Sequence, residues 1–156
     1  MSEFSSKASN RVALNRSLLA IVIGVFFLTI NLREKLLFQK ILTLQLILSI
    51  PLFLTSILAY AKISYKSQIG RWNKFGWITF MLGYAFLMNV IGIIVNNLLG
   101  ISIALLFFFF TWILLLIYSF IDISYDNSVI KERLIKDLSF ITIQFIFGIL
   151  VILEII

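Results

Sequence analysis

Five long apolar runs, which between them contain one charged side chain (Glu154), constrain this 156-residue chain more than any other feature. A helix needs about 20 apolar residues to cross a bilayer, because each residue advances it by about 1.5 Å. The runs do not alternate with polar residues, so they are unlike the strands of a membrane β-barrel. We therefore expect an all-α membrane protein, a polytopic bundle of about five transmembrane helices. The predicted spans cover about residues 17–32, 41–61, 76–95, 99–121 and 138–156.

The composition excludes the other large classes of protein. Hydrophobic residues make up 62% of the chain and charged residues 13%, against about 45–50% and about 25% in soluble domains. A soluble domain of this size leaves roughly a third of its unfolded surface exposed, so it cannot bury such an excess. The absence of cysteine and histidine excludes disulfides, thiolate and imidazole metal ligands and the commonest general base. We expect no cofactor.

Basic residues set the predicted orientation. With the N-terminus inside, the inner segments hold ten Lys and Arg residues and the outer segments hold three, and basic residues favour the cytosolic side. We therefore expect the N-terminus inside and the C-terminus outside, with residues 1–16 as a basic cytosolic tail and residues 17–156 as a single transmembrane domain. No small-residue cleavage site follows the first span, which predicts an uncleaved signal anchor. Segment 33–40 is either an outer loop or an interfacial helix.

Small and polar residues within the spans gather on single helix faces. In the first span Ser17, Ala20 and Gly24 share a stripe with Asn31. Lipid gives no hydrophobic drive for helix association, so such stripes are typical of helix contacts, where small residues allow close approach and polar residues hydrogen-bond. The alternative is a hydrated path for an ion or small solute. The candidate residues for either role are Asn31, Gln45, Ser49, Pro51, Ser56, Asn89, Gly92, Asn96, Thr111 and Gln144.

Two further features bear on transport. Pro51 lies within the second span and removes one backbone hydrogen bond, which predicts a kink near Ile47 that either opens a cavity or has no functional role. Asp122 and Glu154 lie at the ends of predicted spans, and Asp137 falls just before the fifth. A proton-coupled transporter is expected to carry a carboxylate at mid-depth, so the sequence argues against that class.

Two predicted inner loops carry candidate surface sites. Asp122 and Asp126 are one turn apart and form a candidate polar site for a divalent cation or for acid–base chemistry. The basic residues that follow them favour a solvated, salt-bridged loop instead. Loop 62–75 interleaves basic and aromatic residues, which is typical of contact with anionic lipid headgroups. Its candidate contacts are Lys62, Lys66, Arg71 and Lys74.

These observations favour a non-catalytic integral membrane protein, namely a small helix-packing subunit of a larger membrane complex or a homo-oligomer. Its expected partners are the lipid bilayer, including anionic headgroups, and other membrane subunits or copies of itself, but no nucleic acid. One alternative is a lipid-modifying enzyme that uses the two carboxylates of the inner loop. The other is a homo-oligomeric channel or facilitator for an ion or small neutral solute, lined by Gln45, Ser49, Asn89 and Thr111. We favour the plasma membrane of a prokaryote over an organelle membrane.

Overall fold

The computed structural model describes residues 3–32, 39–63, 69–125 and 130–155, and the regular structure in these ranges is helical. Five helical stretches are long and apolar enough to cross a membrane. The predicted fold class, a polytopic α-helical membrane bundle, is confirmed, whereas its orientation stays a prediction. The elements are α1 (Glu3–Asn31), α2 (Gln39–Ile63), α3 (Ile69–Leu99), α4 (Ile101–Tyr125), α5 (Ile130–Gln144), the π-helical segment η3 (Phe145–Ile149) and α6 (Leu150–Ile152).

The first helix is longer than the predicted span. A span of residues 17–32 would reach only about 24 Å, which is short for a hydrocarbon core of about 30 Å. In the structure α1 begins at Glu3 and has 29 residues, so it reaches about 43 Å. Residues 3–16 contain neither glycine nor proline, and these polar residues continue the helix of the span. The predicted basic tail is thus largely helical.

A single glycine separates α3 from α4. Gly100 has a φ of +89°, in the left-handed region that residues with a Cβ rarely adopt. Its N–H donates to the carbonyl oxygen of Asn96 at 2.9 Å, and its own carbonyl accepts from the N–H of Ala104 at 3.2 Å. The connection between the predicted spans 76–95 and 99–121 is therefore a one-residue turn at Gly100.

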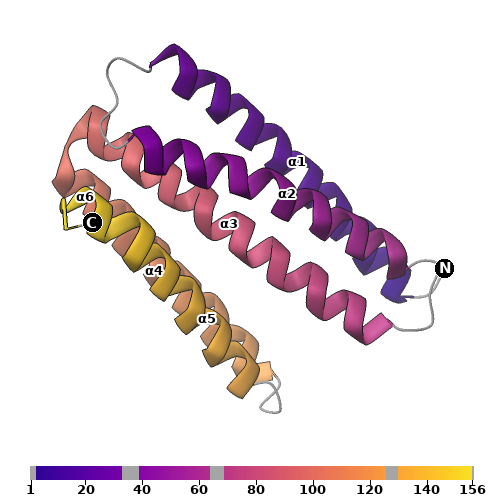
Figure 1. The fold of residues 1–156 in the computed structure, drawn as a ribbon. Coiled ribbons are helices and arrows are strands. Elements are labelled where there is room, and N and C mark those ends of the chain that lie inside the picture. Colours follow the sequence, from indigo (N-terminus) through magenta and orange to yellow (C-terminus); the bar gives the residue numbers. More distant parts are fainter. Residues whose placement is uncertain (1–2, 33–38, 64–68, 126–129, 156) are drawn as a thin grey trace. The chain divides into compact units, whose positions relative to one another are not determined.

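The chain forms two compact units, residues 1–87 and residues 88–156. In the first unit α1, α2 and the beginning of α3 run in alternating directions, with α1 and α2 side by side (Figure 1). In the second unit the end of α3 is followed by α4, α5, η3 and α6, and α4 packs against α5. The helix α3 belongs to both units.

The core of the first unit is built from one face of each helix. On α1, buried residues recur at every seventh position, which is close to two helical turns. These residues are Ala8, Asn15, Val22 and Thr29. Between α2 and α3 the backbones approach closely, because a Cβ atom on Gly83 would lie 3.3 Å from Leu52 Cβ.

Candidate functional site

The second unit contains a tightly packed point around Phe108 of α4, which is fully buried. A Cβ atom on Gly92 of α3 would overlap the ring of Phe108. A Cβ atom on Gly148 of η3 would lie 2.7 Å from Phe108 Cζ and 2.8 Å from Asn89 Oδ1. Because packed interiors leave no room for such overlaps, the two glycines let three helical segments close around one aromatic ring.

Two amides and an indole form a polar group in the same unit. The indole N–H of Trp112 donates to Gln144 Oε1 at 2.7 Å, which ties α4 to α5. The side-chain amide of Asn89 donates from α3 to the carbonyl oxygen of Ile143 at 3.5 Å. Asn89 and Gln144 are both completely buried. Their hydrogen bonds therefore lie in low-dielectric surroundings, where they are electrostatically stronger than in water.

The backbone changes from an α-helix to a π-helix directly after these contacts. The π-helical segment η3 begins at Phe145, the residue after Gln144. A π-helical turn is wider than an α-helical turn and occurs frequently at functional sites. Gly148 lies within this segment and faces Phe108 and Asn89, so the widened turn coincides with a close helix contact of the unit.

A buried carboxylate lies further along the contact between α4 and α5. The hydrogen bond from Trp112 to Gln144 fixes the antiparallel register of the two helices. Two helical turns closer to their connection, Ser119 of α4 is level with Asp137 of α5. Each is 4% exposed, and Ser119 Oγ and Asp137 Oδ1 have no hydrogen-bond partner within the described ranges. Two buried polar groups without partners at one level of the contact make this pair a candidate polar site.

Asp137 is not among the site residues predicted from the sequence. The predicted fifth span begins at residue 138, because the basic residues before Asp137 resemble a loop. In the structure the apolar helix runs from Leu134 to Ile152. Asp137, Gln144 and Val151 are all buried and lie seven residues apart. This spacing, which places Asp137 on the same helix face as Gln144, is the sequence signal that could have identified Asp137. An ionisable residue inside a span is costly, which makes it a functional candidate by default.

The structure places the predicted packing or path-lining residues in different environments. Asn96 and Thr111 are half-buried, whereas Asn31 and Pro51 are exposed. The helix α2 continues through Pro51. The buried members of the set are Gln45, Ser49, Ser56, Asn89, Gly92 and Gln144.

The hydroxyl groups in this set hydrogen-bond to helix backbones. Ser49 Oγ donates to the carbonyl oxygen of Leu46 at 2.7 Å, and Thr111 Oγ1 donates one turn back along α4 at 2.8 Å. Ser56 Oγ instead crosses from α2 to α3 and donates to the carbonyl oxygen of Gly76 at 2.7 Å. The bond of Ser56 is of the kind expected for helix packing in lipid, whereas the bonds of Ser49 and Thr111 satisfy each hydroxyl within its own helix.

The candidates of the inner loops are only partly described. Lys62, Arg71 and Lys74 are exposed at the ends of α2 and α3. Lys66 and Asp126 lie outside the described residues, as does the side chain of Asp122. The enzyme hypothesis, which rests on these two aspartates, therefore gains no support from the geometry.

A shallow groove lies on the surface of α4 in the second unit. It has a volume of about 340 Å³ and is lined by Ser102, Leu105, Leu106, Phe109, Trp112 and Ile149. The indole N–H of Trp112 is already used by Gln144, and most of the remaining lining is hydrocarbon. The groove suits an apolar chain better than an ion.

Comparisons with known proteins bring no relative to this geometry. No protein-family model matches the chain, and none of the curated proteins or solved structures matches it either. Its five apolar helices make the chain an integral membrane protein, and any more specific function has to be argued from its own residues.

Proposed function

We propose that the protein is a non-catalytic helix-packing subunit of a membrane complex or of a homo-oligomer. It assembles through α1 with other membrane subunits or with copies of itself. The observation that carries this proposal is the contrast between the two faces of α1. The face that packs within the first unit presents Ala8, Asn15, Val22 and Thr29, all buried. The opposite face presents Ser17, Ala20, Gly24 and Asn31, all exposed.

Small residues on other helices of the first unit are already used for close approach. A Cβ atom on Gly76 would lie 3.1 Å from Ala59 Cβ, and one on Gly83 would lie 3.3 Å from Leu52 Cβ. At Gly24, by contrast, no atom lies within 4 Å of the position of a Cβ. Small residues gain little from contact with acyl chains but allow a second helix to approach. The outer face of α1 therefore offers the same means of packing to another chain.

The burial of the polar residues supports packing rather than a hydrated path. Gln45, Ser49 and Asn89, three of the four side chains predicted to line a channel, are at most 2% exposed. Asn89 contacts the backbone of α5, and Ser49 is bonded within α2. The bond of Asn89 stabilises a contact between helices, and Ser49 is satisfied within its own helix without water, which favours a packing subunit. Its location in the plasma membrane of a prokaryote is part of the same proposal.

The test is extraction of the full chain from its native membrane in mild detergent, followed by mass determination and identification of co-purifying chains. We expect a stoichiometric assembly, either of this chain alone or with other subunits. Gly24→Leu should at least halve the assembled fraction while the melting temperature of the monomer is kept. Gly70→Leu is the matched control, because Gly70 is also exposed and a Cβ there would meet no atom.

Two results would overturn the proposal. One is a monomer without stoichiometric partners over the whole range of concentrations in detergent and in lipid vesicles. The other is an assembly that Gly24→Leu and Gly70→Leu leave equally intact, which would remove α1 as the contact.

A further inference from the structure

At the predicted cytosolic end of the first unit, one cationic side chain of α1 contacts residues of both α2 and α3. Arg11 of α1 donates from Nη1 to the hydroxyl of Tyr60 on α2 at 3.3 Å and to Asn73 Oδ1 on α3 at 2.5 Å. Its guanidinium also lies 5.1 Å from the centre of the Tyr60 ring. Beneath these contacts is a cluster of apolar side chains from all three helices, Ala8, Val12, Tyr60, Ile63 and Trp72.

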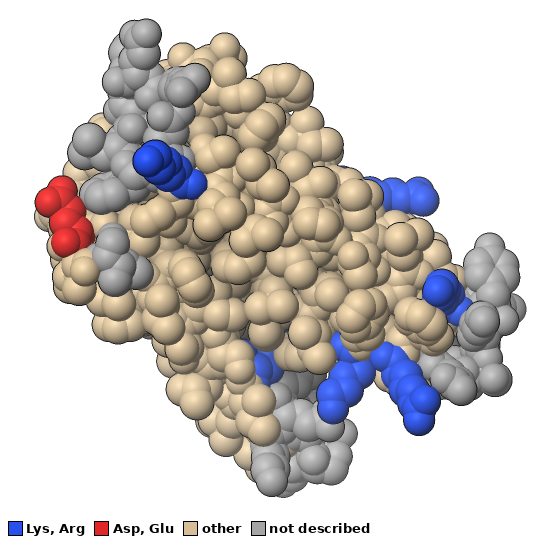
Figure 2. Space-filling model, viewed as in Figure 1, with Lys and Arg blue, Asp and Glu red and all other residues tan. Residues whose placement is uncertain are grey.

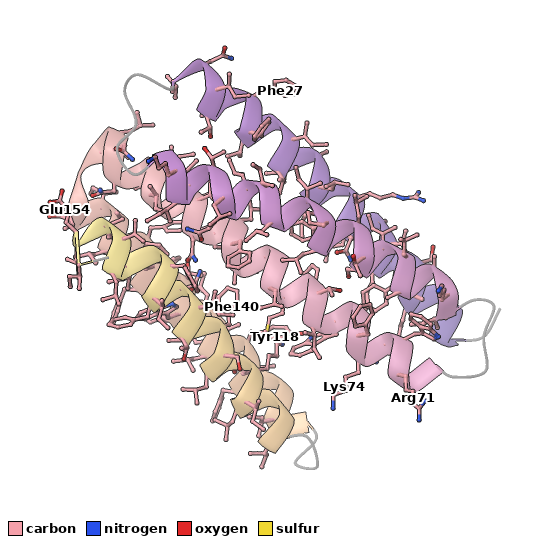
Figure 3. The ribbon with its side chains drawn as sticks, in the orientation of Figure 1. Phe27, Arg71, Lys74, Tyr118, Phe140 and Glu154 are labelled. Carbon is pink, nitrogen blue, oxygen red and sulfur yellow. The ribbon has the colours of Figure 1, made fainter. Side chains whose placement is uncertain are left out.

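Further cations surround this cluster. Lys62 Nζ lies 4.3 Å from the centre of the Trp72 ring. The side chains of Arg71 and Lys74 point away from α3 (Figure 3) and are exposed. Figure 2 shows basic side chains gathered near the end at which Figure 1 marks the N-terminus. We call Arg11, Lys62, Arg71 and Lys74 the basic collar.

The collar has little negative charge of its own to balance it. Residues 1–87 contain ten basic residues and two acidic ones. Within the described part of the chain, Arg71 and Lys74 make no hydrogen bond or ion pair. Like charges gathered at one end of the unit repel within the screening length of about 8–10 Å. A bound anion would relieve this repulsion and accept hydrogen bonds from the guanidinium and ammonium groups, as phosphate oxygens do.

The surface beside the collar is apolar, which selects among anions. Phe75 and Ile78 each lie four residues after a collar residue, Arg71 and Lys74, so each pair shares a face of α3. Phe75 is 46% exposed and Ile78 is 37% exposed. The face therefore presents cations first and hydrocarbon next along the helix. This order matches the phosphate and the acyl chains of a phospholipid, whereas inorganic phosphate has no apolar part to contact the hydrocarbon.

We propose that the basic collar binds the phosphate headgroup of an anionic phospholipid, whose acyl chains lie along Phe75 and Ile78. Anionic lipids are concentrated on the cytoplasmic leaflet, and the charge distribution of the chain predicts that this end faces it. Because the collar includes residues of α1, α2 and α3, the bound lipid holds the beginning of α1 against the other two helices.

The experiment measures lipid binding to the full-length chain in detergent by native mass spectrometry and by the melting temperature. The probes are phosphatidylglycerol, phosphatidylcholine and inorganic phosphate. We expect phosphatidylglycerol to bind and raise the melting temperature, and the other two to do neither. Lys74→Gln should weaken binding about fivefold, since a basic residue near an anionic surface contributes about 1 kcal/mol.

Lys40→Gln is the matched control, because it removes the same charge from an exposed side chain at the other end of α2. Lys74→Arg should keep the binding, which separates loss of charge from misfolding. Equal binding of phosphatidylcholine, or equal weakening by Lys40→Gln, would overturn the proposal. Stabilisation by inorganic phosphate that equals that by phosphatidylglycerol would show an anion site without a lipid preference and would overturn the assignment to phospholipid.

Discussion

The two units of this protein bury polar groups in different ways. In the first unit the buried hydroxyl of Ser56 donates to another helix, at the carbonyl oxygen of Gly76, and one buried amide oxygen, Asn15 Oδ1, has no partner in the described ranges. In the second unit, Ser119 and Asp137 each bury an oxygen without a hydrogen-bond partner in the described ranges. Charge differs as well, because residues 88–156 contain three basic residues and five acidic ones, whereas residues 1–87 contain ten and two.

Contacts at glycine are tighter in the second unit than in the first, where a Cβ atom on Gly76 or Gly83 would lie 3.1 or 3.3 Å from its neighbour. The first unit is held at one end by hydrogen bonds and cation–π contacts that tolerate small shifts. The second unit depends on the fit of Phe108 against two glycines, and a fit of this kind fails when one methyl group is added. Substitutions of equal size should therefore have unequal effects in the two units.

The largest expected effect comes from adding one methyl group beside Phe108. Gly92→Ala and Gly148→Ala should each lower the free energy of unfolding by about 1–3 kcal/mol, the usual cost of overpacking a core. The reason is that a Cβ atom on Gly148 would lie 2.7 Å from the Phe108 ring, and one on Gly92 would overlap it. The measurement is thermal unfolding of the purified protein in a mild detergent.

Gly70→Ala is the control for this prediction. The Cβ of an alanine there meets no atom, and alanine in a helix is more favourable than glycine by about 0.5–1 kcal/mol. Gly70→Ala should leave the stability unchanged or raise it. A smaller side chain at Phe108, as in Phe108→Leu, should recover part of the loss from Gly92→Ala. A double variant that melts no higher than Gly92→Ala alone would contradict the overpacking explanation.

The second effect has the opposite sign. The double variant Ser119→Ala, Asp137→Leu should raise the free energy of unfolding by about 1–3 kcal/mol, because it removes two buried polar groups without partners and fills their place with hydrocarbon. The corresponding double variant in the first unit, Ser56→Ala with Asn73→Leu, should lower it, since both of those groups are hydrogen-bonded. If both double variants destabilise the fold alike, the second unit satisfies its polar groups as the first does.

The third effect tests the hydrogen bond between Trp112 and Gln144. Trp112→Phe should cost about 0.6 kcal/mol, the average measured for hydrogen bonds between membrane helices, and no more than about 1.7 kcal/mol, the largest value measured. A double-mutant cycle with Gln144→Leu separates the bond from the change in packing. A coupling energy of zero would mean that the 2.7 Å contact contributes nothing to the stability of the second unit.

The sequence predicts the helices well, and it predicts the inward face of α2 better than that of α1. Five apolar runs suffice for the spans, because crossing lipid requires length and hydrophobicity alone. Helix ends are harder to predict, since α1 extends back to Glu3 through polar residues that form a helix outside the core of the bilayer equally well. The turn at Gly100 lies after the predicted outer segment, because apolar residues on both sides of that glycine hide it.

Which face of a helix is buried depends on its partners, and hydropathy does not report them. The stripe of α1 that contains Gly24 was expected to face inward, but it is exposed, and the face with Val22 is buried. A small-residue stripe indicates that a contact exists without stating whether it lies within the chain or between chains. Asp137 was missed for a related reason, because its burial follows from the register of α5 against α4, which only the folded contact sets.

Loss of the Ser56 hydroxyl in the first unit should have the smallest effect on stability. Ser56→Ala removes the hydrogen bond from α2 to the carbonyl oxygen of Gly76, yet Thr79 Oγ1, which shares its one proton between this oxygen and that of Phe75, lies 3.1 Å away. The acceptor therefore keeps a partner, and the free energy of unfolding should fall by less than about 0.6 kcal/mol, the average for such bonds. The double variant Ser56→Ala, Thr79→Val removes both side-chain donors and leaves the carbonyl only its helical N–H, so its loss should exceed the sum of the two single losses. Additive losses in thermal unfolding would contradict this expectation. They would show that two donors to one carbonyl make the first unit no more tolerant of losing a hydrogen bond than the second unit, where a single bond joins Trp112 to Gln144.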